Sequence, residues 1–123
     1  IGAGSEYLYG LILKLFGREK RYAIESPSYK KIEELYRAAE LSYDALSLTA
    51  DGIDSTALSK TRADVLHTTP YRSFPSGVTA SASKRHEYIR FAETGDRYII
   101  EDDFESEFSV FAKPAETLFA LSG

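Results

Sequence analysis

Hydrophobic and polar residues follow two different spacings along the chain, and each spacing predicts a different kind of element. Residues 7–16 are almost all apolar and Gly17 follows them, which predicts a helix that stops at the glycine. In residues 29–39 the apolar side chains recur three and four positions apart, which predicts a second helix, with Ser28 as its cap. A third helix is expected over residues 81–94.

Short apolar runs that end at a proline or at a polar stretch predict strands. They cover residues 22–25, 42–48, 63–67 and 97–102. One or two helical turns are expected over residues 54–59, and Ser81 or Ser83 can cap the helix that Gly95 ends. Alternating strands and helices predict the α/β class, with a three-layer α/β/α architecture, a mostly parallel sheet and helices on both faces.

The composition narrows the classes of protein and of site. With 123 residues the chain forms one domain at most. Its 15 Lys+Arg against 19 Asp+Glu give a net charge of -4, which argues against a nucleic-acid surface on this segment. The absence of Cys excludes disulfides, cysteine zinc sites and cysteine nucleophiles, and two His are too few for a histidine metal cage.

The chain carries no sign of a membrane or of an export signal. No apolar run approaches the roughly 20 residues of a membrane span, and the first residues lack the basic start of a signal peptide. We therefore expect a cytoplasmic protein with no membrane partner. Because the chain holds no Met and Ile1 has the character of a strand end, we expect it to be a piece of a longer protein.

Ligands of parallel sheets bind at the carboxyl ends of the strands, so the segments that follow predicted strands are candidates for a binding site. They are residues 2–6 (GAGSE), 25–29 (ESPSY), 69–77 (TPYRSFPSG) and 101–108 (EDDFESEF). The first opens a helix, where backbone N–H groups can hold an anion, and Ser5 adds a hydroxyl. A plain turn without a ligand remains an alternative there.

Two further interpretations concern the acidic residues of these segments. A dinucleotide fingerprint would use Glu25 as its ribose-binding acid, but its third glycine would fall on Tyr7, which argues against a nicotinamide or flavin site. The acidic run at 101–108 is compatible with a solvated face, with a divalent cation or with a counter-charge for a cationic ring nitrogen.

Taken in order, the four segments resemble the large domain of fold-type I pyridoxal-phosphate enzymes of the class I/II aminotransferase group. They are more similar to the aminotransferase-like domain of MocR-type regulators of the GntR family. Members read G-(T/S)-(E/Q)-x-L, (E/D)-x-P-x-Y, T-P-S-H-Q-(F/Y)-P-(T/S)-G and I-I-E-D-D-Y-D-S-E-F. This chain has GSEYL, ESPSY, TPYRSFPSG and IIEDDFESEF, so the resemblance covers nearly all of it.

The resemblance implies pyridoxal 5'-phosphate as the cofactor and assigns roles to individual residues. Gly4 and Ser5 would hold its phosphate at the helix start, and Tyr29 would stack on its pyridine ring. Asp102 would pair with the protonated ring nitrogen, which keeps the ring cationic.

The sequence departs from the family at the partners of the ring hydroxyl. Phe74 stands where aminotransferases have an Asn, and Phe104 stands where the family has a Tyr. The chain also contains no Asn or Gln at any position. The usual hydrogen bonds to the ring hydroxyl are therefore missing from these positions, which bears on cofactor affinity or catalysis and not on the fold.

The resemblance also implies that the Schiff-base lysine lies beyond the end of this chain. Lys60 and Lys84 each follow a serine, but both precede Asp102, and we expect both to be solvated. This segment is thus expected to contain no catalytic residue and no metal site, and to be empty of cofactor by itself.

The function implied is that of an effector domain in a transcriptional regulator. Residues 1–123 would be part of the pyridoxal-phosphate-binding large domain. A DNA-binding winged helix-turn-helix before the segment, and the lysine and a small domain after it, would complete a homodimeric protein that senses the cofactor or an amino compound. The alternatives are a segment of a true aminotransferase and a structural remnant without cofactor.

Overall fold

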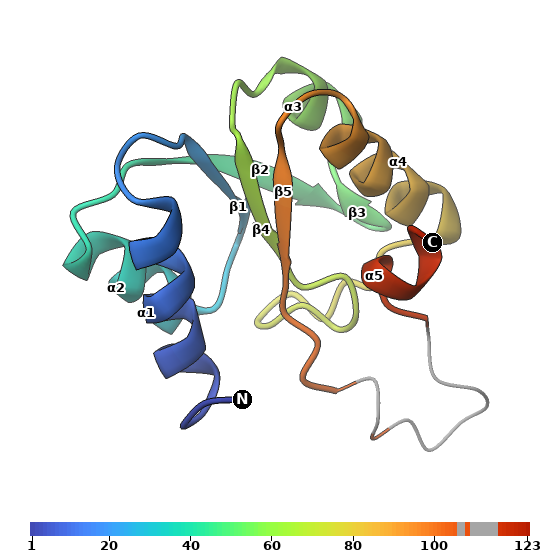
Figure 1. Cartoon of the computed structure of the whole chain (residues 1–123). Coiled ribbons are helices and arrows are strands. Elements are labelled where there is room, and N and C mark those ends of the chain that lie inside the picture. Colours follow the sequence, from blue (N-terminus) through green and yellow to red (C-terminus); the bar gives the residue numbers. More distant parts are fainter. Residues whose placement is uncertain (106–107, 109–115) are drawn as a thin grey trace.

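The computed structural model describes residues 1–105, 108 and 116–123 (Figure 1). Helices and strands alternate along most of the chain. In order they are α1 (Ser5–Phe16), β1 (Tyr22–Ser26), α2 (Lys30–Ala38), β2 (Tyr43–Thr49), β3 (Gly52–Ile53), α3 (Ser55–Lys60), β4 (Val65–Thr68), α4 (Ala82–Glu93), β5 (Tyr98–Glu101) and α5 (Leu118–Leu121). The helices and strands predicted from the spacing are all present, with ends shifted by at most two residues.

The strands form one mixed sheet in the order β3-β2-β1-β4-β5. The pairs β1–β2, β1–β4 and β4–β5 are parallel, whereas β2–β3 is antiparallel. The prediction of a mostly parallel sheet is therefore confirmed. Because parallel strands share a direction, the carboxyl ends of β1, β4 and β5 meet at one edge of the sheet.

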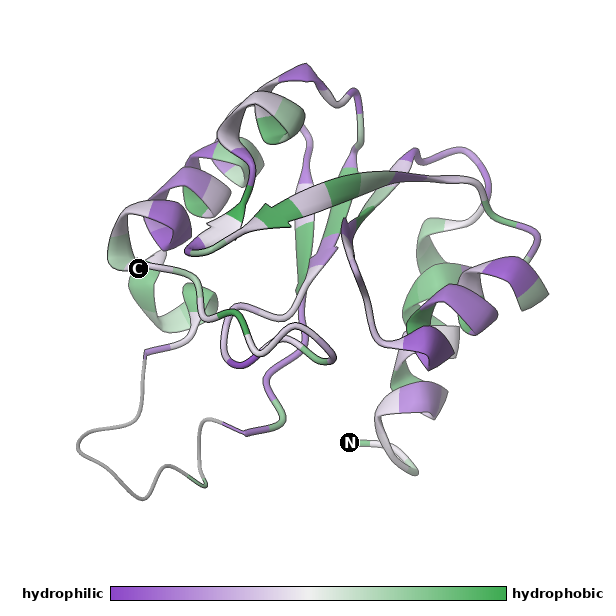
Figure 2. Ribbon diagram, turned by 180° about the vertical axis from the view of Figure 1, so that it is seen from behind, coloured by the Kyte–Doolittle hydropathy of each residue, from purple (hydrophilic) through white to green (hydrophobic). Residues whose placement is uncertain are grey.

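Side chains alternate between the two faces of the sheet, as the pleat requires. In β1, Tyr22 and Ile24 pack into one hydrophobic cluster with α1 and α2, while Ala23 between them packs into a second cluster with α3, α4 and α5. Figure 1 shows these two groups of helices on opposite sides of the strands, and Figure 2 shows hydrophobic colouring concentrated in the strands and on parts of each helix. The three-layer architecture is confirmed.

Strand β3 was missed by the sequence interpretation. It turns back from β2 through Ala50 and Asp51, with Leu48 opposite Ile53 and Thr49 opposite Gly52. Gly52 has φ 135, and a Cβ there would lie 2.6 Å from the Tyr88 hydroxyl oxygen. The Asp-Gly pair was the available signal, because this dipeptide favours tight hairpins.

Three other expectations about the ends of elements turn out differently. Ile1 was expected to end a buried strand, but it lies outside every strand and is fully exposed. Ser28 does not cap α2, whose N-cap is Tyr29 and makes no side-chain capping bond. Helix α5 was not predicted. Its first residues are held by Glu101 at the end of β5, whose carboxylate accepts hydrogen bonds from the backbone N–H of Leu118 at 2.7 Å and of Phe119 at 3.3 Å.

In the part of the chain that the structure describes, none of the helices has both the length and the apolar character needed to cross a lipid bilayer.

Candidate binding site at the carboxyl edge of the sheet

A cavity of about 620 Å³ opens at the edge where β1, β4 and β5 end. Its walls come from the start of α1, the segment between β1 and α2, the loop after β4 and the segment after β5. The sequence-predicted site residues that line it are Ser5, Tyr29, Phe74, Asp102 and Phe104. Gly4, the remaining one, is the N-cap of α1 directly before Ser5.

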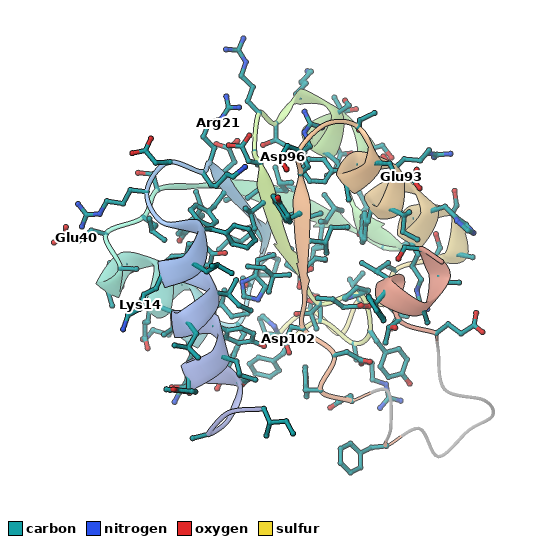
Figure 3. All side chains as sticks on the ribbon, viewed as in Figure 1. Lys14, Arg21, Glu40, Glu93, Asp96 and Asp102 are labelled. Atoms are coloured by element: carbon teal, nitrogen blue, oxygen red, sulfur yellow. The ribbon has the colours of Figure 1, made fainter. Side chains whose placement is uncertain are left out.

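Asp102 is brought to the cavity by the parallel pairing of β4 with β5. Thr68 at the end of β4 lies opposite Glu101, and the backbone N–H of Asp102 donates to the Thr68 carbonyl at 2.9 Å. Figure 3 shows Asp102 just beyond the carboxyl end of β5, at the opposite end of the sheet from Arg21 and Asp96. The side chain is half-buried.

The charge state of Asp102 is set by opposing influences. Burial raises the pKa of this carboxyl, and the neighbouring Asp103 raises it further, while the nearby Tyr9 hydroxyl lowers it. Tyr9 lies in α1 and lines the same cavity. Burial raises the pKa of Tyr9, and the Asp102 carboxylate nearby raises it further.

The start of α1 has the features of an anion-binding helix end. Gly4 adopts φ 94, a left-handed conformation that glycine accepts without strain, and it makes no side-chain capping bond to the helix. The N–H groups of the first turn therefore keep their capacity to bind an anion, and the helix dipole favours negative charge there.

The exposed aromatic side chains of Tyr29, Phe74 and Phe104 line the cavity. The ring of Tyr29 meets the ring of Phe74 edge to face, with centroids 5.8 Å apart and an interplanar angle of 82°. Phe104 lies on the segment after β5, and all three rings are exposed. Exposed aromatic faces around a cavity offer a stacking surface for a planar ligand.

Charged residues at the rim are arranged in pairs. Lys31 forms an ion pair with Glu6 at 2.7 Å, and Arg72 approaches Glu105 at 3.4 Å. Arg72 has φ 49 and donates its backbone N–H to the Thr79 hydroxyl at 3.1 Å. This hydrogen bond lies within the loop between β4 and α4.

Glu25 does not have the geometry of a ribose-binding acid. It is buried, and its carboxylate accepts hydrogen bonds from the Thr68 hydroxyl, from the Thr69 backbone N–H and from the Ser73 hydroxyl. Burial raises the pKa of Glu25, and these three bonds oppose the rise. Its oxygens are thus occupied inside the fold, behind the wall of the cavity.

The two Ser-Lys lysines differ from each other. Lys60 is exposed, as expected. Lys84 is buried, which corrects the expectation that it is solvated: its ammonium donates to the Ile53 carbonyl at 2.7 Å and to the Ser55 hydroxyl at 2.5 Å. It packs beside α3 on the face of the sheet away from the cavity, and neither lysine lines the cavity.

Within residues 1–105, 108 and 116–123 no group of three or more His, Asp or Glu side chains could hold a metal ion. Residues 106, 107 and 109–115 lie outside the described residues, so the end of the acidic run is not placed.

Tyr9 and Ser73 are the site residues that the sequence interpretation missed. Tyr9 had a detectable signal, because it lies four positions after Ser5, and such residues share one face of a helix. Ser73 had none, since its partner Glu25 is 48 positions away.

No family model matches this sequence. Similar curated proteins are bacterial regulators. An uncharacterized HTH-type transcriptional regulator of Bacillus subtilis, YdeL, is 23% identical over 121 residues, which are 98% of this chain and 26% of that protein. The HTH-type pyridoxine biosynthesis transcriptional regulator PdxR of Corynebacterium glutamicum is 28% identical over 124 residues, with 99% and 27% covered. The chain thus spans about a quarter of the length of these relatives.

Similar solved structures are aminotransferases. The kynurenine aminotransferase of Pyrococcus horikoshii superposes with a TM-score of 0.86 at 23% identity, over 96% of this chain and 32% of that one. The α-aminoadipate aminotransferase LysN of Thermus thermophilus gives a TM-score of 0.86 at 22% identity, over 97% and 32%. This chain has the aminotransferase fold. The predicted resemblance, aminotransferase-like in fold and regulator-like in sequence, is confirmed.

Within the aminotransferase fold, the cavity combines groups that suit pyridoxal phosphate. A helix start with uncapped N–H groups suits a phosphate, exposed aromatic faces suit a planar ring, and a half-buried carboxylate suits a cationic ring nitrogen. The residues present therefore fit the cofactor at its phosphate, ring and nitrogen, while Phe74 and Phe104 offer no hydrogen bond to a ring hydroxyl.

Proposed function

We propose that this chain is part of the effector domain of a helix-turn-helix transcriptional regulator, and that the domain binds pyridoxal 5'-phosphate. Residues 1–123 would form part of the large domain, with the DNA-binding domain before them and the Schiff-base lysine and small domain after them. The observation that carries the proposal is the convergence of Ser5, Tyr29 and Asp102 on one cavity. The similarity to regulators, one of them named for pyridoxine biosynthesis, supports it.

Each site residue has a role in this proposal. Gly4 and Ser5 bind the phosphate through the first-turn N–H groups of α1 and the serine hydroxyl. Tyr29 covers one face of the ring and excludes water from it, and Asp102 holds the proton on the ring nitrogen. When bound, the cofactor supplies an electron-accepting ring that reacts with amino compounds. Phe74 and Phe104 contribute apolar contact only, so the ring hydroxyl depends on other partners.

The main alternative is a segment of a true aminotransferase, and the solved structures that share the fold favour it. The curated relatives favour the regulator instead, because the matches are to HTH-type regulators. A cofactor-free remnant is a third possibility, and the apolar side chains at positions 74 and 104 favour it.

The first experiment reads the gene on both sides of this segment and expresses the full-length protein. An upstream winged helix-turn-helix and a downstream Ser-Lys strand are expected. Purified protein should bind pyridoxal phosphate, and the cofactor or an amino compound should change its affinity for its own promoter DNA. Turnover of amino acids at ordinary enzyme rates, roughly 1–1000 per second, would support the aminotransferase instead.

A pair of variants tests the site itself. Asp102→Asn should weaken pyridoxal-phosphate binding roughly 10- to 100-fold, because a hydrogen bond to a charged group contributes about 1.5–3 kcal/mol. Asp96→Asn is the matched control, since Asp96 is exposed and lies at the other end of the sheet (Figure 3). Equal affinity of the two variants for pyridoxal phosphate would contradict the role of Asp102. If the wild type did not bind pyridoxal phosphate, the cofactor-free remnant would be the supported alternative.

We also propose that the full-length protein is a homodimer. Helix α1 carries the exposed apolar side chains Leu8, Leu11 and Leu15, at spacings that place them on one stripe of the helix. Leu15 is 81% exposed. A stripe of this kind supports burial against another part of the assembly. Sedimentation equilibrium of the full-length protein measures the number of subunits.

A further inference from the structure

An ion pair joins α2 to the start of α1. The Lys31 ammonium in α2 donates a hydrogen bond to a carboxylate oxygen of Glu6, in the first turn of α1, at 2.7 Å. Both residues line the cavity, and so does Ser5, which directly precedes Glu6 in the chain. The ammonium therefore lies beside the helix end to which the proposed function assigns the phosphate.

The ammonium of Lys31 keeps donors for a further partner. Within the residues that the structure describes, its hydrogen bond to Glu6 is the one that it makes. An ammonium carries three N–H donors, so two of them remain for a ligand. The hydrogen bond to Glu6 also raises the pKa of Lys31, which keeps this side chain charged.

The pair is exposed to water and can exchange partners. The side chain of Lys31 is 51% exposed and that of Glu6 is 55% exposed. Ion pairs at this exposure contribute little to stability, because water screens the two charges. A phosphate group carries more negative charge than a carboxylate and offers three acceptor oxygens, so it can compete for the same ammonium.

A phosphate that binds at the start of α1 needs a cation beside it. The helix dipole favours an anion there, but Glu6 already places one in the first turn. A phosphate would bring further negative charge to the same helix end, and like charges repel. In the described part of the chain, the other cation that lines the cavity is Arg72, which approaches Glu105 on the segment after β5. Lys31 is thus the cation placed to offset the charge of the phosphate.

We propose that Lys31 is a further ligand of the cofactor phosphate, and that Glu6 competes with the phosphate for the Lys31 ammonium. This inference rests on the proposed function, because it takes the start of α1 as the phosphate site. When the phosphate binds, Lys31 donates to it, and Glu6 remains as a nearby negative charge that lowers the affinity. The pair therefore sets how tightly the domain holds the cofactor.

The test compares pyridoxal phosphate with pyridoxal, which lacks the phosphate, by titrating each into the full-length protein. Lys31→Met should weaken the binding of pyridoxal phosphate roughly tenfold and change that of pyridoxal by less than about twofold. Lys30→Met is the matched control, since Lys30 pairs with Glu34 within α2 at 3.9 Å and does not line the cavity. Equal losses for the two ligands, or in the two variants, would overturn the inference.

Glu6→Gln should have the opposite effect. It should strengthen the binding of pyridoxal phosphate roughly two- to fivefold, because it removes a competitor for Lys31 and a like charge. Glu34→Gln is its control and should leave the affinity within about twofold of the wild type. If the pair served only to hold α1 against α2, Glu6→Gln and Lys31→Met would both weaken the binding of both ligands, and the inference would be wrong.

A second measurement separates this inference from the proposed function. A ligand that binds the folded state raises the unfolding temperature, and inorganic phosphate can be tested without the cofactor. At constant ionic strength, inorganic phosphate should stabilise the wild type and Lys30→Met, and it should stabilise Lys31→Met much less. If the wild type responds in this way but does not bind pyridoxal phosphate, the proposed function fails while Lys31 remains a phosphate ligand. Equal stabilisation of Lys30→Met and Lys31→Met overturns the inference.

Discussion

The hydroxyl of Ser73 donates a hydrogen bond to the carboxylate of Glu25, although the two residues are 48 positions apart. Both side chains are buried. The second oxygen of the same carboxylate accepts from the Thr68 hydroxyl at 2.9 Å and from the Thr69 backbone N–H at 3.1 Å. One buried carboxylate thus connects the end of β1, the end of β4 and the loop that carries Phe74.

Ser73→Ala should lower the free energy of unfolding by about 1–3 kcal/mol, because it leaves a buried carboxylate oxygen without its donor. Urea unfolding at pH 7 measures the change. Ser59→Ala is the control, since Ser59 is exposed and bonds only within its own helix, and its effect should stay within about 0.5 kcal/mol. Equal effects of the two substitutions would show that the hydrogen bond from Ser73 to Glu25 does not contribute to the stability of the fold.

His67 should make stability depend on pH. Burial lowers its pKa from 6.5 to about 4, so between these values the unfolded chain binds a proton that the folded chain does not. Stability should therefore be complete above pH 6.5 and fall as the pH drops toward 4, by on the order of 3 kcal/mol. His67→Phe should remove this part of the slope.

The matched control for His67 is the exposed His86, the other histidine of the chain. Urea unfolding of His86→Gln should show the same slope between pH 4 and pH 6.5 as the wild type. If His67→Phe kept that slope, the loss of stability in acid would have to come from other groups.

The cap of α4 can be tested with two neighbouring serines. The Ser81 hydroxyl accepts from the backbone N–H of Lys84 at 3.2 Å, whereas Ser83 lies inside the helix and is exposed. Ser81→Ala should destabilise the protein by about 1 kcal/mol, and Ser83→Ala should have little effect. Thermal unfolding of both variants measures the two changes in stability. A larger loss of stability in Ser83→Ala than in Ser81→Ala would show that Ser81 is not the cap of α4.

Lys84 and Lys60 form another natural pair for comparison. Lys84→Met should lower the free energy of unfolding by about 1–3 kcal/mol, because the buried Ile53 carbonyl loses its ammonium donor. Lys60→Met should change it by less than about 0.5 kcal/mol, since Lys60 is exposed. Guanidinium unfolding measures both, and a neutral Lys84→Met would mean that the methionine side chain compensates by packing.

Much of the fold could be predicted from the sequence, because its signals are local. The apolar spacing of residues 29–39 indicates α2, Gly17 marks the end of α1, and short apolar runs indicate β1, β4 and β5. The four polar segments after predicted strands also indicated where a cavity would lie. The parallel sheet then brings Ser5, Tyr29 and Asp102 together at one edge.

The errors in the sequence interpretation concern partners that are distant along the chain. Lys84 reads as a solvated lysine until β3 and α3 supply the Ile53 carbonyl and the Ser55 hydroxyl around it. Glu25 reads as a possible ribose ligand until the loop after β4 folds back and Ser73 occupies its oxygen. The residues next to Lys84 and Glu25 in the sequence do not indicate that either side chain is buried.

Apart from β3 and α5, the sequence by itself determined the order of helices and strands, the mostly parallel class of the sheet and the segments that line the cavity, since these depend on side-chain periodicity and on chain direction. Only the tertiary structure decided that Tyr9 lines the same cavity as Asp102 and that Ser73 bonds to Glu25. Such pairs depend on how α1 packs on the sheet and how β4 aligns with its neighbours, and a shift of one residue in either would separate them.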